Sequence, residues 1–122
     1  MSALLWVGLG GACGAVLRHA VGLGLRSLYG GPFPAATMVV NVAGCLAIGW
    51  ALGNQASDPR WSEPMRAFGV IGFLGAFTTF SSFGLETVHL VQVGRVGAAF
   101  WSVALNLVLG LGAVVVGAHL AS

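Results

Sequence analysis

Long apolar stretches separated by short polar connections are the main pattern along this chain. Each stretch is near the ~20 residues that an α-helix needs to cross a bilayer, so we predict four transmembrane helices. The connections carry turn residues, with glycine and proline in 28–34 and the most polar run in 54–64. We therefore expect one all-α membrane domain, residues 1–122, with spans at about Ala3–Leu25, Ala36–Gly53, Met65–Val91 and Val96–His119.

Composition supports the bilayer as the solvent of this chain. Hydrophobic residues make up 57% of it and charged residues 7%, whereas soluble globular domains carry about 25% charged residues. The 20 glycines suit helices that pack closely in lipid. A net charge of +2, with no lysine, is too small to indicate a nucleic-acid partner. The first stretch lacks a basic region and a cleavage pattern, so we interpret it as a retained span rather than a signal peptide.

The stretch from Gly72 to Phe83 is poor material for an unbroken helix. Gly72 and Gly75 weaken the helical preference, and four hydroxyl residues then occupy five positions, 78–82. Broken backbone is tolerated in lipid only where protein buries it or where it lines a cavity. Carbonyl oxygens freed by a break can coordinate a cation such as Na⁺. We predict that the third helix is broken here and that this is the functional centre.

Aromatic and acidic side chains follow this stretch at helical spacing. Phe80 and Phe83 are three residues apart, on roughly one face, and Glu86 follows after the same interval. The edge of an aromatic ring is positive, so two rings can line an anion path; they can also simply face core or lipid. An intramembrane carboxylate is a functional candidate, although Glu86 could instead lie near the membrane edge and pair with an arginine.

Polar residues in the second and fourth spans need partners in hydrocarbon. Asn41 lies deep in the second span, where an amide lines either a helix interface or a polar pathway. Ser102 and Asn106 are four residues apart in the fourth span and Gly110 continues their face. Such a stripe can replace part of the hydration shell of an ion, or it can join two helices by hydrogen bonds.

The first span places an arginine on a glycine face. Gly10, Gly14 and Arg18 follow at intervals of four residues, and the two glycines form a GxxxG pattern that lets another helix approach closely. Three interpretations of Arg18 are open. It can extend to the membrane surface, bind backbone carbonyls, or face an aqueous vestibule that attracts anions.

Arginines are almost balanced between the two sides of the membrane. Arg60 and Arg66 lie on or beside one side, and Arg26 and Arg95 lie on the other. The positive-inside rule then has little bias to act on. Such a chain can insert both ways, and two opposite copies can pair about a two-fold axis; a single orientation is the alternative.

Signs of catalysis or of a conventional metal site are missing from the sequence. Cys13 and Cys45 lie in apolar segments, with no Cys or His at ligand spacing from either. The three acidic residues are scattered, and no nucleophile elbow, phosphate loop or HExxH pattern occurs. We predict that the chain is not an enzyme.

Three segments resemble the Fluc (CrcB) family of bacterial fluoride channels. Gly11 to Arg18 is similar to the family's GGxxGAxxR opening, Thr37 to Gly44 to its TLxVNxxG segment, and Gly72 to Phe83 to its GxxGxxTTFSTF segment. The three motifs occur in the family's order in the first three spans, and the resemblance extends across all four. The resemblance implies a fluoride-selective channel in the bacterial plasma membrane that exports toxic cytoplasmic fluoride passively.

The resemblance also implies an assembly and a bound ion. It implies an antiparallel, dual-topology homodimer with two pores and a structural Na⁺ on the two-fold axis. By position, main-chain carbonyls of Gly75 and Thr78 match the ligands of that Na⁺. Phe80, Phe83 and Asn41 match the family's pore residues, and Thr79, Ser81 and Ser82 match its hydroxyl run.

Elsewhere the match is looser. Ser102 and Asn106 fall where the family has a polar track, but Asn106 stands in place of a serine and Gly110 lacks a hydroxyl. Arg18 and Glu86 remain vestibule or structural candidates. The main rival class, a proton-coupled small multidrug-resistance exporter, needs a carboxylate in its first span, and this chain has none there. A non-transporting assembly subunit would explain the glycines but not the 72–83 stretch.

Overall fold

The computed structural model describes residues 2–31, 33–57 and 61–121, and every regular element in these ranges is helical. Asp58 and Arg60 of the polar connection lie outside the described residues. Arg60 is one of the arginines counted in the charge balance. In chain order the elements are α1 (Ala3–Leu28), α2 (Ala35–Ser57), α3 (Glu63–Met65), η1 (Arg66–Leu74), α4 (Gly75–Phe77), α5 (Phe80–Gln92) and α6 (Val96–Ala121).

Four of these helical segments are long and apolar enough to span a membrane, with α3 to α5 together forming the third. The prediction of an all-α, multi-pass membrane protein is therefore confirmed. The first span is longer than predicted, because α1 continues to Leu28, and Tyr29 closes it by donating its backbone N–H to the carbonyl of Leu25. The apolar pattern of the sequence predicts that a span exists, but the hydrogen bonds of its last turn determine the residue at which the helix ends.

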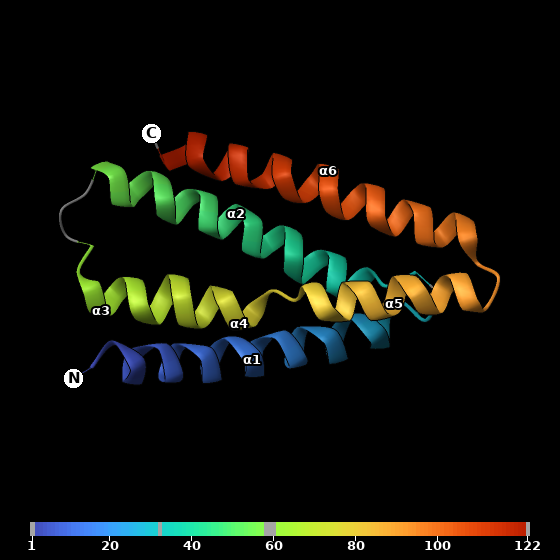
Figure 1. Ribbon diagram of the computed structural model, residues 1–122, viewed down its shortest axis with the longest axis horizontal. Coiled ribbons are helices and arrows are strands. Elements are labelled where there is room, and N and C mark those ends of the chain that lie inside the picture. The colour runs from blue at the N-terminus through green and yellow to red at the C-terminus, as the bar shows by residue number, and fades with distance from the viewer. Residues whose placement is uncertain (1, 32, 58–60, 122) are drawn as a thin grey trace.

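Successive spans run in opposite directions, as Figure 1 shows. α1 lies along the third span, and α2 lies along α6. Both chain ends lie at one end of the bundle, while the turn from α5 to α6 lies at the other. That turn contains Gly94, whose φ of 85° is readily adopted only by glycine.

Glycines set the close approach of α1 to the third span. A Cβ added to Gly10 would collide with the carbonyl of Phe68, and one added to Gly14 would collide with that of Phe73. The expectation that this GxxxG face admits another helix is confirmed. Because the backbones touch, the third span is held firmly at the height of α4.

The second close pair of helices, α2 and α6, is also packed through glycines, and here each helix contributes one. Gly49 lies against the carbonyl of Val114, and Gly117 lies against the carbonyl of Leu46. Dispersion contacts between such surfaces are the main attraction between helices in lipid, where apolar burial gives little.

The third span contains a π-helix, η1, which the sequence did not predict. Gly72 lies inside η1 and Gly75 begins α4, so neither glycine leaves the helical conformation. Gly72 serves packing instead, since a Cβ there would meet the backbone of Val7 and Gly11 in α1. The residues with extended backbone are Thr78 and Thr79, between α4 and α5. We refer to these two residues as the 78–79 link.

Candidate functional site around the 78–79 link

The 78–79 link is ordered by hydrogen bonds at both of its ends. Thr78 has φ −87° and ψ 159°, and Thr79 has φ −151° and ψ 116°. The N–H and the side-chain hydroxyl of Thr78 both donate to the carbonyl of Leu74, at 3.2 and 3.1 Å. The hydroxyl of Thr79 accepts from the N–H of Ser82 at 3.1 Å and so caps α5. Two threonines therefore close one helix and open the next.

Asn41 of α2 binds the backbone of the link from the side. Its Nδ2 donates to the carbonyl of Thr79 at 3.1 Å, and its Oδ1 accepts from the N–H of Thr79 at 2.8 Å. The amide thus replaces the peptide partner that an extended residue would have in a sheet. One N–H of the Asn41 amide takes no part in this pair. Asn41 therefore joins α2 to the third span, and its place on a polar pathway stays a prediction.

Arg18 of α1 binds the preceding helix end. Its Nε donates to the carbonyl of Ala76 at 3.0 Å, which confirms the interpretation that the guanidinium binds backbone. The carbonyls of Leu74, Ala76 and Thr79 therefore all have donors. Those of Gly75, Phe77 and Thr78 take part in none of these bonds.

A groove of about 370 Å³ runs past the link and is lined by no charged residue. Phe80 is 82% exposed beside it, and its ring lies 5.6 Å from that of Phe83 at an angle of 53°. A Cβ at Gly75 would meet nothing, so the groove is open at this point. The candidate residues that line it are Asn41, Gly75, Thr78, Thr79, Phe80, Phe83 and Asn106.

Ser102 does not line the groove. It is fully buried, and its hydroxyl oxygen has no hydrogen-bond partner. Asn106 donates its Nδ2 to the carbonyl of Ser102 at 2.7 Å, and its Oδ1 is buried without a partner. Neither side chain makes a hydrogen bond between helices within the described residues, so the interpretation as interhelical contacts is wrong for both.

Thr79 of the link also lines a polar cavity of about 140 Å³. Arg18, Arg26, Ser82 and Glu86 contribute to its wall, together with Thr79. The side chain of Ser81 is exposed and lies within 3.3 Å of the Thr79 hydroxyl. Two arginines and one carboxylate therefore line this cavity, and its role as a vestibule that attracts anions stays a prediction.

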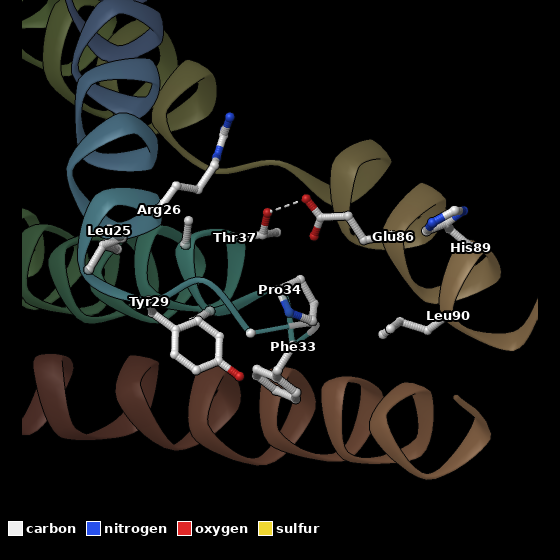
Figure 2. Close-up of a pocket in the computed structure, with 12 residues that line it drawn as sticks. Leu25, Arg26, Tyr29, Phe33, Pro34, Thr37, Glu86, His89 and Leu90 are labelled. Carbon is white, nitrogen blue, oxygen red and sulfur yellow. Dashed lines mark hydrogen bonds between the residues drawn. The ribbon is translucent and has the colours of Figure 1, made fainter. Parts of the chain in front are cut away.

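Glu86 binds a residue that sequence reasoning did not assign a role. The hydroxyl of Thr37 donates to Glu86 Oε1 at 2.8 Å, while Oε2 is buried without a partner (Figure 2). Within the described residues Glu86 pairs with no arginine, so that alternative is wrong. The available signal was that Thr37 and Asn41 are four residues apart, on one face of α2.

Conventional metal ligands do not gather anywhere in the described ranges, where no group of three His, Cys, Asp or Glu side chains is found. Cys13 is exposed and Cys45 lines the groove, and both are free thiols. A cation at the link would therefore have to be held by main-chain or hydroxyl oxygens, which suit hard ions.

Comparisons with known proteins agree on one family. Residues 5–118 match the family model described as "CrcB-like protein, Camphor Resistance (CrcB)". A protein of Rhodospirillum centenum named fluoride-specific ion channel FluC is 43% identical, over 96% of this chain and 93% of the relative. A second, from Symbiobacterium thermophilum, is 41% identical over 94% of each chain. A third, from Shewanella sediminis, is 40% identical over 98% of this chain and 96% of its own.

Proposed function

The chain belongs to the CrcB-like protein family, and we propose that it is a fluoride-selective ion channel. The observation that carries this proposal is the uncharged groove at the 78–79 link, where amide, hydroxyl and aromatic groups lie together. Relatives covering nearly the whole chain are named for the same ion. A channel moves its ion down a gradient and catalyses no reaction, and passive export from the cytoplasm follows whenever internal fluoride is higher.

The chemistry of the groove fits a small, strongly hydrated anion. A channel must replace the hydration shell of its ion with groups of its own. The remaining N–H of Asn41, the hydroxyl of Thr79 and the positive ring edges of Phe80 and Phe83 are such groups. With no arginine in the lining, the groove offers binding weak enough for the ion to leave.

The groove also supports the proposal that a second copy is needed. Phe80 is 82% exposed, and no atom lies near the position of a Cβ at Gly75. In a single chain the groove is therefore open on this side. An antiparallel homodimer of two inverted chains would close two such grooves, one per copy. The near balance of arginines on the two sides is compatible with insertion in both orientations.

A structural Na⁺ between the two copies completes the proposal. Arg18, Asn41 and the Thr78 side chain bind none of the carbonyls of Gly75, Phe77 and Thr78, and the family resemblance points to Gly75 and Thr78 among these three. Two carbonyls from each copy would give four oxygen ligands of the kind that binds hard cations. When bound, Na⁺ supplies positive potential near the path and joins the two links.

Ion efflux from liposomes tests the proposed function directly. Liposomes that contain the purified protein should lose fluoride rapidly, while chloride-loaded liposomes should retain their ion. Loss of neither ion from folded, dimeric protein in Na⁺ buffer would contradict the channel. Equal loss of both would contradict its selectivity.

Replacing Phe80 tests whether the groove is the path. We expect Phe80→Ile to lower fluoride efflux about tenfold, because an aliphatic side chain has no positive edge. Folding should be preserved, because Phe80 is mostly exposed. Phe100→Ile is the matched control, since Phe100 is 64% exposed on α6 and outside the groove. Unchanged efflux in the Phe80 variant would remove the ring from the mechanism.

A further inference from the structure

The face of α1 that carries Gly10, Gly14 and Arg18 continues at intervals of four residues to Gly22 and Arg26. Gly10 and Gly14 pack against the backbone of the third span, but Gly22 packs against a side chain. A Cβ added to Gly22 would lie 3.0 Å from Nη2 of Arg26, and its three nearest neighbours all belong to that guanidinium. The last glycine of this face therefore makes room for an arginine rather than for a helix.

Arg26 is turned inward, although it lies two residues from the end of a membrane span. Arginines near span ends commonly extend to the headgroup layer. Side chains of an α-helix point towards its N-terminus, over the residue four positions earlier, and here that residue is Gly22. Figure 2 shows the Arg26 side chain directed away from Tyr29 and Phe33. The guanidinium is therefore held along α1, at the wall of the polar cavity that Gly22 and Arg26 both line.

The two arginines of the polar cavity are more available to a ligand than its carboxylate. Arg26 is exposed and makes no hydrogen bond or ion pair with any residue that the structure describes, while Arg18 donates its Nε to Ala76. Glu86 lines the same wall, but Thr37 binds its Oε1 and its Oε2 is buried. A guanidinium without a partner keeps all five N–H donors for a ligand. The polar cavity therefore presents an excess of positive charge to an incoming anion.

The polar cavity and the uncharged groove meet at Thr79, which lines both. Uncharged donors in the groove act on an ion only at hydrogen-bond distance, whereas the attraction of a charge falls slowly with distance. An anion can therefore be collected by the arginines of the polar cavity and then passed to the groove, where no fixed charge retains it.

We propose that Gly22 is a positioning residue for ion entry. It seats the guanidinium of Arg26 at the wall of the polar cavity, where this charge and that of Arg18 concentrate fluoride in front of the 78–79 link. The inference rests on the proposed function, which supplies the ion. Gly22 does not touch the ion and acts through Arg26, because a side chain at position 22 would displace the guanidinium towards the headgroup layer. The effect is on the rate of entry, so it is largest when fluoride is scarce and ionic strength is low.

Fluoride efflux from liposomes tests the inference under three conditions: low fluoride in dilute sodium gluconate, low fluoride in concentrated sodium gluconate, and saturating fluoride. Gly22→Val puts methyl groups where the guanidinium lies, so we expect about fivefold slower efflux in the first condition. The rates should equal those of the original protein in the other two, because ~1 M salt reduces the screening length to about 3 Å and saturation removes the limit on entry. Gly24→Val is the matched control, since a Cβ there meets nothing.

Further variants separate the loss of a positioned charge from a blocked cavity or a damaged fold. Arg26→Gln should reproduce the salt-dependent loss, and Arg26→Lys should retain most of the efflux because it keeps the charge. Gly22→Ala, which displaces the guanidinium less, should show a smaller loss with the same salt dependence. In the double variant of Gly22→Val with Arg26→Gln the two losses should not add, since both remove one charge from the polar cavity.

Three results would overturn the inference alone. They are a Gly22→Val loss that persists in concentrated salt, losses that add in the double variant, and unchanged efflux in the Gly22 and Arg26 variants. Absence of fluoride efflux from the original protein would instead overturn the proposed function, and this inference with it.

Discussion

The contact between α2 and α6 and the 78–79 link hold the same bundle together by opposite means. Between α2 and α6, Gly49 and Gly117 place bare backbone against the carbonyls of Val114 and Leu46. At the link, Asn41 and Arg18 reach the backbone with long polar side chains. The peptide groups of an intact helix are hydrogen-bonded within the helix, so two such helices associate through complementary surfaces alone. The peptide groups of extended residues in a membrane need hydrogen-bond donors and acceptors from other parts of the chain.

The difference has a consequence for ion binding. Helix pairs packed by glycine leave no polar atom available, because every carbonyl stays in its own ladder. At the link, Arg18 and Asn41 bind the carbonyls of Ala76 and Thr79 but not those of Gly75 and Thr78, and the proposed Na⁺ site rests on this difference. We therefore expect damage to the glycine contact to affect folding first, and damage to the link to affect transport first.

The largest effect is expected from Gly117→Leu, because the new side chain would meet the carbonyl of Leu46 and force α2 and α6 apart. We expect little or no folded protein after extraction, measured by the monodispersity of the purified sample. Gly112→Leu is the matched control on the same helix, where an added Cβ meets nothing. Equal yields of the two variants would show that backbone contact does not hold this pair.

Removal of Na⁺ should abolish fluoride efflux while leaving the helices intact. The proposed ligands are the carbonyls of Gly75 in α4 and Thr78 in the link, so loss of the ion should loosen this region but not the α2–α6 pair. The experiment exchanges Na⁺ exhaustively for a large organic cation and measures efflux together with helix content by circular dichroism. Full efflux without Na⁺ would contradict the structural ion.

Asn41→Leu should lower efflux by more than tenfold. The variant keeps the volume of the side chain but leaves the N–H and the carbonyl of Thr79 without partners, at about 1–3 kcal/mol each. Asn41→Asp keeps the acceptor but loses the donor and, when ionised, adds a negative charge to the groove, so it should lower fluoride efflux at least as much. If Asn41→Leu transports normally, the pairing with Thr79 does not position the link.

Arg18→Gln is expected to have the smallest effect of the four. Only one hydrogen bond, to the carbonyl of Ala76, is lost, and the shorter amide recovers part of it when the helix end shifts. Efflux should fall severalfold, without a change in the folded yield. Arg95→Gln, in the exposed turn between α5 and α6, is the control. A larger loss than that of Asn41→Leu would reverse the order of importance of the two contacts.

Sequence reasoning anticipated the spans well and the use of individual residues only in part. Four apolar stretches and a GxxxG face are local patterns, and the structure contains both. The same reasoning placed a break within the stretch 72–83 and attributed it to Gly72 and Gly75 together with the hydroxyl residues at 78–82. In the bundle Gly72 packs directly against α1, and this tertiary contact outweighs the low helix propensity of glycine. The π-helix η1 has no sequence signal of its own.

By itself, the sequence determined that this chain lies in a membrane, that it crosses four times, and which polar residues lie in hydrocarbon. These properties depend on composition and on periods of a few residues. Only the tertiary structure decided who binds whom: Asn41 with Thr79, 38 residues apart, and Thr37 with Glu86, 49 apart. It likewise brought Arg18 to Ala76, across 58 residues. Such pairings depend on how far each helix is rotated and shifted along its neighbour, and backbone contacts at the glycines set both.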